Sequence, residues 1–81
     1  MMRKNIKSNE WHKMISGNIT SFYKNNLEIR ILYDYSLFKW KVVLLEDDKF
    51  KERLARTTLG GIKGKVQAIK YAKDYMRNGK I

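Results

Sequence analysis

Hydrophobic and polar residues alternate through the middle of the chain in a way that predicts antiparallel strands. In 27–33 the apolar side chains fall mainly on odd positions, and in 38–44 they fall mainly on even positions. A period of two is typical of strands that bury one face. Asn25 and Asn26 separate 27–33 from an earlier strand-like run, and Asn tolerates the positive φ of a two-residue hairpin turn.

The first turn pairs Lys24 with Leu27 and Phe22 with Ile29. A second two-residue turn, at Tyr35 and Ser36, then pairs Tyr33 with Phe38, Ile31 with Trp40, and Ile29 with Val42, in a register consistent with the alternation. One face of this meander is then almost wholly apolar. The other face is mixed and places Arg30 directly opposite Lys41, and such like-charge pairs destabilise a sheet.

An amphipathic helix is predicted over roughly 62–77, with Gly60, Gly61 and Gly64 marking its entry. Its apolar stripe consists of Ala68, Ile69, Ala72, Tyr75 and Met76. The fold class is therefore α+β, a three-stranded antiparallel meander with one face covered by a C-terminal helix. Residues 50–58 form either a fourth short strand or an irregular return.

The N-terminal region is predicted to hold a mobile basic arm over 1–7, followed by a single small domain over 8–81. Ser8 can cap a short helix over 9–16, which gives the order αβββα; a strand there is the alternative. No apolar run approaches the roughly 18 residues of a membrane span, and no signal-peptide core follows the basic start. We therefore expect a cytoplasmic protein without a membrane partner.

Charge changes this picture most, because 18 Lys and Arg face only eight Asp and Glu, for a net charge of +10. Half of the acids lie in one short stretch: Glu46, Asp47, Asp48 and Glu52. The remaining surface should attract polyanions in a salt-dependent way. A basic but merely soluble protein is the alternative. The acidic spacing matches no EF-hand loop, so we expect no metal and no cofactor, and an acidic loop that faces away from a polyanion.

The expected partner is RNA or DNA, with structured RNA slightly favoured. The candidate contacts are Lys63, Lys65, Lys70, Arg53, Arg56, Arg30, Lys39, Lys41 and Tyr23. Phosphate would relieve the repulsion between Arg30 and Lys41, and Tyr23 offers a ring for stacking. The glycines before the helix would let backbone approach an anion. The alternatives are a sheet face neutralised by Glu28 and Asp34, and a solvated lysine pair.

No enzyme is expected, because the chain has no cysteine and its single histidine, His12, has no catalytic partner. The sequence has no proline and is rich in Lys, Asn and Ile. This composition is common in AT-rich genomes, including those of many phages, and fits an accessory or regulatory protein of phage type. The alternative function is an inhibitor or regulator that docks on a host protein through exposed Leu32, Val43 and Tyr23. An exposed edge on the third strand would also allow a homodimer.

The helix start resembles that of the double-stranded-RNA-binding domain, which has an αβββα layout. The residues in comparable places are Gly60, Gly61, Lys63, Lys65, Ala68, Lys70 and Ala72. The resemblance implies that Lys63, Lys65 and Lys70 contact phosphates across a groove. In layout, the chain is also similar to the arm-type DNA-binding domain of phage integrases, which places an exposed sheet in the major groove.

Overall fold

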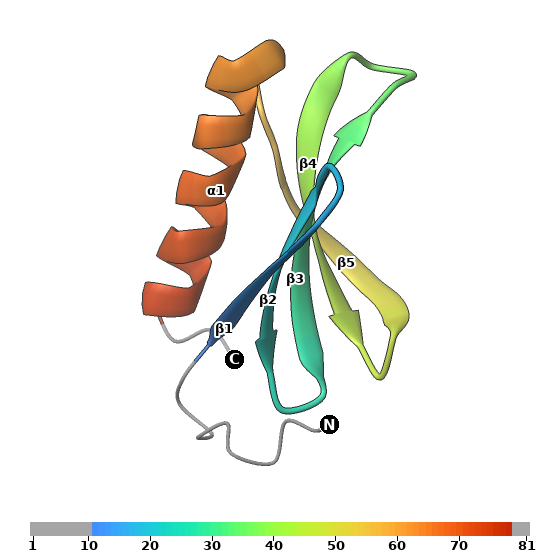
Figure 1. Ribbon diagram of the computed structural model, residues 1–81, viewed down its shortest axis with the longest axis vertical. Coiled ribbons are helices and arrows are strands. Elements are labelled where there is room, and N and C mark those ends of the chain that lie inside the picture. The colour runs from blue at the N-terminus through green and yellow to red at the C-terminus, as the bar shows by residue number, and fades with distance from the viewer. Residues whose placement is uncertain (1–10, 79–81) are drawn as a thin grey trace.

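The computed structural model describes residues 11–78 as one antiparallel sheet with a helix packed on one face (Figure 1). The elements are β1 (His12–Ser16), β2 (Ile19–Lys24), β3 (Leu27–Asp34), β4 (Lys39–Glu46), β5 (Lys49–Arg56) and α1 (Gly61–Arg77). The five strands are neighbours in chain order. The α+β class with a C-terminal helix is thus confirmed, and the sheet is larger than expected.

The first strand replaces the helix that was predicted over 9–16. His12–Ser16 pairs antiparallel with β2, and Gly17, with φ of 59°, provides the positive φ for the turn. A single short helix gains little stability by itself, whereas a strand here completes the hydrogen bonding of β2. Residues 9 and 10, and the predicted arm over 1–7, lie outside the described residues.

The hairpin between β2 and β3 has the predicted register. Phe22 faces Ile29 and Lys24 faces Leu27. Asn25 has a φ of 56°, the conformation for which Asn is suited. The two asparagines therefore set this turn as the sequence indicates.

The register between β3 and β4 differs from the prediction by two residues. Tyr33 faces Trp40, and the turn spans 35–38. The Asp34 carboxylate accepts hydrogen bonds from the Ser36 amide (3.0 Å) and hydroxyl (2.6 Å), and Phe38 takes a φ of 56°. Phe38 is consequently 70% exposed in the turn instead of lying on the apolar face.

Apart from Phe38, this shift by an even number of residues keeps the paired side chains on their predicted faces but changes their cross-strand neighbours. Arg30 lies opposite Val43, so the predicted pair of Arg30 with Lys41 is wrong. Lys41 instead lies between Leu32 and Arg56.

The final strand is a full element of eight residues. β5 pairs with β4 along its length and has two register shifts, between Val42 and Val43 and between Leu44 and Leu45. The edges of the sheet are therefore β1 and β5. The run 38–44, which was expected to offer a free edge to a second copy, is interior.

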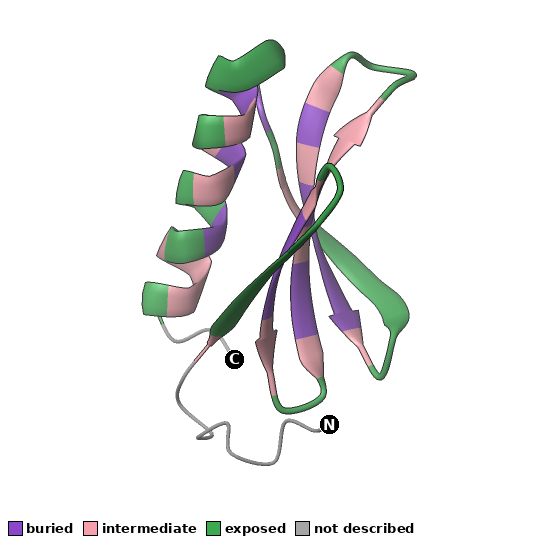
Figure 2. Cartoon of the chain, viewed as in Figure 1, coloured by how far each residue is buried: buried purple, intermediate pink, exposed green. Residues whose placement is uncertain are grey.

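The core lies between α1 and the sheet face that we call the inner face. Ala68 and Ala72 are fully buried with Ile29, Ile31 and Val42 (Figure 2). The helix approaches closely at Gly64, where a Cβ atom would lie 2.0 Å from the Leu59 carbonyl oxygen and 2.8 Å from Trp40 Cδ1. Within residues 11–78, no helix has the length and apolar character needed to cross a bilayer.

Candidate nucleic-acid interface

Four cations gather on the outer face of the sheet, the face away from α1. Lys39 and Lys41 alternate with the core residues of β4, and Arg56 faces Lys41 directly across the ladder. Arg53 lies opposite Val43 on the same face. None of these four side chains forms an ion pair or hydrogen bond with another described residue. We call them the basic stripe.

The β2–β3 half of the same face is neutralised internally. Glu28 is 4% exposed and accepts hydrogen bonds from Arg30 Nε (2.8 Å), Arg30 Nη2 (3.0 Å) and Ser21 Oγ (2.7 Å). Burial alone would raise the pKa of Glu28, but the bonds from Arg30 and Ser21 hold that pKa below its ordinary value. The bond to Glu28 likewise raises the pKa of Arg30.

Tyr23 belongs to this neutralised half. It faces Glu28 across the β2–β3 ladder, and its hydrogen bond also helps to lower the pKa of Glu28. Arg30 and Tyr23 therefore interact with Glu28 within the fold. The alternative interpretation, a sheet face neutralised by Glu28 and Asp34, agrees with the structure in this half of the sheet through Glu28.

The acidic loop lies at the end of the sheet where the β2–β3 and β4–β5 turns meet. The Asn26 amide side chain donates to the Asp47 carboxylate (3.2 Å), and Lys51 pairs with Glu46 (3.1 Å). Lys39, Lys41 and Arg56 lie toward the other end. No set of three or more His, Asp or Glu side chains among residues 11–78 is arranged to hold a metal ion.

The helix bases lie in the other layer of the molecule. Lys63 and Lys70 are exposed on α1, which covers the inner face, so the sheet separates them from the basic stripe (Figure 1). Lys65 points another way, with its Nζ atom 5.8 Å from the centre of the Trp40 ring. Gly64, predicted as part of an anion-approaching loop, is instead buried by packing. The structure therefore does not bring the nine predicted contact residues together on one surface.

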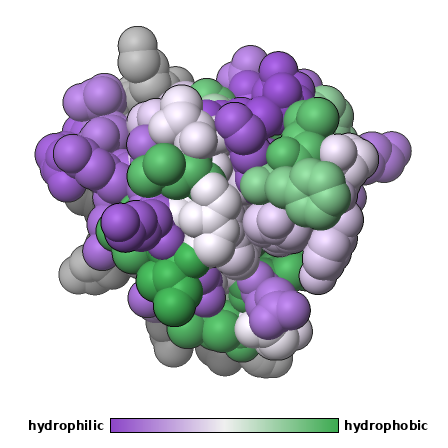
Figure 3. Space-filling view, turned by 90° about the horizontal axis from the view of Figure 1, so that it is seen from above, coloured by the Kyte–Doolittle hydropathy of each residue, from purple (hydrophilic) through white to green (hydrophobic). Residues whose placement is uncertain are grey.

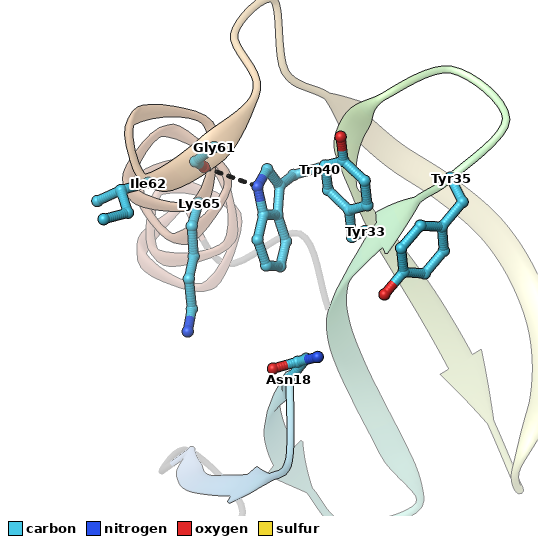
Figure 4. Close-up of a pocket in the computed structure, with 7 residues that line it drawn as sticks. All are labelled: Asn18, Tyr33, Tyr35, Trp40, Gly61, Ile62 and Lys65. Carbon is cyan, nitrogen blue, oxygen red and sulfur yellow. Dashed lines mark hydrogen bonds between the residues drawn. The ribbon is translucent and has the colours of Figure 1, made fainter.

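Sequence reasoning missed an aromatic hollow beside the helix start. Tyr33, Tyr35 and Trp40 line it together with Asn18 and Lys65, and its volume is about 380 Å³ (Figure 4). Trp40 was expected in the core; it is 9% exposed, and its Nε1 donates to the Gly61 carbonyl oxygen (2.9 Å). The density of aromatic residues between 33 and 40 was the available signal.

Comparison with known proteins returns no matching family model, no matching curated protein and no matching solved structure. The similarity to double-stranded-RNA-binding and integrase arm-type domains thus stays a prediction.

Proposed function

We propose that this protein binds nucleic acid without catalysis and that the basic stripe contacts the phosphate backbone. The observation that carries the proposal is the direct pairing of Lys41 with Arg56, flanked by Lys39 and Arg53. Like charges directly opposite each other destabilise an antiparallel ladder. A phosphate between them would convert that repulsion into two charge-assisted contacts.

The stripe is compact enough for several phosphates to be contacted together. Lys39 and Lys41 lie roughly 7 Å apart along one strand, and neighbouring strands lie about 5 Å apart. Four such contacts would give a slope of log affinity against log salt of about −3.6 for duplex DNA and about −2.8 for a single strand.

The preference for structured RNA loses its main support. It depended on the glycine-rich helix start, where Gly64 is now seen packed against Leu59 and Trp40. Lys63 and Lys70 also face away from the stripe. RNA and DNA therefore enter the test on equal terms.

The test compares two double variants with the same change in charge. Lys41→Gln with Arg56→Gln alters the stripe, and Lys63→Gln with Lys70→Gln alters the helix. Binding to single- and double-stranded RNA and DNA is measured at two or more salt concentrations. We expect the stripe variant to lose on the order of tenfold or more in affinity and to reduce the salt slope by about two. The helix variant should lose much less.

Two outcomes would overturn the proposal. The first is an absence of binding by the natural sequence to all four ligands at low salt. The second is an equal loss in both double variants, because this would show attraction to net charge without a defined surface.

A protein-directed role is the second candidate, although its expected surface has changed. Val43 is only 7% exposed, since Arg30 and Arg53 flank it and have stems long enough to cover it. Apolar exposure is found instead on α1, where Ile62 is 83% and Val66 is 63% exposed. A partner that survives nuclease treatment in a pull-down would favour this role.

A further inference from the structure

Two adjoining hollows lie at one end of the sheet, near the start of β2 and the end of β3. The first is the aromatic hollow beside α1. The second, about 330 Å³, is lined by Ser16, Ile19 and Leu32. Both hollows share Asn18, Tyr33 and Tyr35. We call the two adjoining hollows together the aromatic groove.

Three aromatic rings follow one another in the groove. Tyr33 meets Tyr35 edge to face, with centroids 5.0 Å apart, and meets Trp40 in the same way at 5.4 Å. Tyr35 is 73% exposed at the turn. An edge-to-face contact covers at most one face of one of the two rings, so highly exposed Tyr35 keeps open ring surface on which a planar base can stack.

The end of the molecule where the groove lies has a surface of mixed hydropathy. Figure 3 looks onto the end where α1 begins, and shows groups of hydrophobic side chains separated by near-neutral ones, with hydrophilic side chains around them. The exposed apolar residues of this region are Leu37, Phe38, Leu59 and Ile62.

One cation lines the groove, and two more lie beside it on the sheet. On the helix side, the Lys65 side chain runs past the Trp40 ring toward the level of Asn18 (Figure 4). On the outer side, Leu32 lies opposite Lys41, which in turn lies opposite Arg56. Neither hollow has an Asp or Glu among its described lining residues. The aromatic groove therefore lies between Lys65, which lines it, and Lys41 of the basic stripe, which lies beside the lining residue Leu32.

We propose that the aromatic groove binds single-stranded nucleic acid, with a base stacked on Tyr35 and phosphates held by Lys41 and Arg56 on one side and Lys65 on the other. This rests on the proposed function and narrows it to unpaired strands. In a duplex both faces of an internal base are covered by the neighbouring base pairs, so such a base could not stack on the ring of Tyr35. An uncharged apolar peptide would leave the cations on both sides without partners.

The test uses labelled oligouridine and oligodeoxythymidine of roughly 12 nucleotides, within the usual site sizes of such proteins, and the duplexes with their complements. We expect the natural sequence to prefer the single strands. Tyr35→Ala should weaken single-strand binding on the order of tenfold with the salt slope unchanged, and Tyr35→Phe should retain binding. Phe50→Ala is the matched control, since Phe50 is 65% exposed and lies outside the groove.

The outcomes separate this inference from the proposed function. No binding to any strand at low salt overturns both. Equal or stronger binding to duplexes, with Tyr35→Ala behaving as the natural sequence does, overturns the groove alone. If Tyr35→Ala leaves oligonucleotide binding intact but abolishes capture of a protein from nuclease-treated lysate, the groove docks a protein and the inference is wrong.

Discussion

The two halves of the outer sheet face carry similar basic side chains, which the fold uses in different ways. In the β2–β3 half, Arg30 is fixed by two hydrogen bonds to buried Glu28. In the β4–β5 half, Lys41 and Arg56 face each other, and neither forms an ion pair or hydrogen bond with a described residue. A cation in the first half contributes to the stability of the fold, whereas a cation in the second half is available to a ligand.

The difference arises from where the neighbouring acids point. Glu28 is two residues from Arg30, so both side chains lie on one face of β3. In β5, Glu52 pairs with Leu44 and so lies on the inner face with the core, and Glu46 has the same parity as Leu44 in β4. The acids of β4 and β5 therefore point away from the stripe. Asp34 of β3 lies on the outer face opposite Lys39, but its carboxylate accepts hydrogen bonds from Ser36 and forms no ion pair with the stripe.

Removing the buried carboxylate gives the largest expected effect. Glu28→Gln takes away the charge that holds Arg30 and should lower the free energy of unfolding by about 2 kcal/mol. The Arg30 side chain is 35% exposed, so water can solvate it after the change, which keeps the loss moderate. For a chain of this size, such a loss lowers the melting temperature by roughly 8–16 °C, which calorimetry can measure.

The exposed ion pair between Lys51 and Glu46 provides the control. These side chains are 54% and 43% exposed, and Glu46→Gln should lower the free energy of unfolding by no more than about 0.5 kcal/mol.

Nucleic-acid binding by the folded fraction should be unchanged in Glu28→Gln. Equal losses of stability in both variants would remove the distinction between a neutralised half and a free half.

Acid should reduce the difference between the natural sequence and Glu28→Gln. Because folding lowers the pKa of Glu28, its contribution is complete above the unfolded pKa of about 4.3 and is lost as the pH falls through the folded pKa. Urea unfolding from pH 7 to pH 3 should therefore show the two stabilities converging. Asp34, whose pKa is also lowered, chiefly by its hydrogen bond from Ser36, is present in both proteins and cancels. Parallel curves would contradict this role for Glu28.

The faces of the sheet could be predicted from sequence, but the neighbours within each face could not. Alternation in 27–33 and 38–44 fixes parity, and a turn of two or four residues satisfies it equally. The four-residue turn is stabilised by the hydrogen bonds from Ser36 to the Asp34 carboxylate, and it requires Phe38 to adopt an unfavourable positive φ. An Asp side chain that bonds to the backbone two residues later is a known turn signal, so the stabilisation of this turn by Asp34 could have been predicted from the sequence.

The grouping of the basic stripe was harder to predict. Its four members were named as candidates, but β5 has little alternation, and its two register shifts decide which of its side chains face outward. The role of Gly64 was equally hard to predict, because a glycine can allow either close packing of a helix or close approach of the backbone to an anion. The helix itself, with its buried alanines, followed directly from the apolar stripe.

The smallest expected effect is a gain in stability from relieving the like-charge pair. Arg56→Gln should raise the free energy of unfolding by about 0.3 kcal/mol at low salt, and high salt should abolish the gain because exposed charges are screened. Arg53→Gln is the matched control, since Arg53 shares the strand, the charge and the exposure but lies opposite Val43. Urea unfolding of both variants at two salt concentrations measures the difference. If Arg56→Gln gains no more than Arg53→Gln, the repulsion between Lys41 and Arg56 is already relieved within the chain, and the strongest reason for phosphate to bind there disappears.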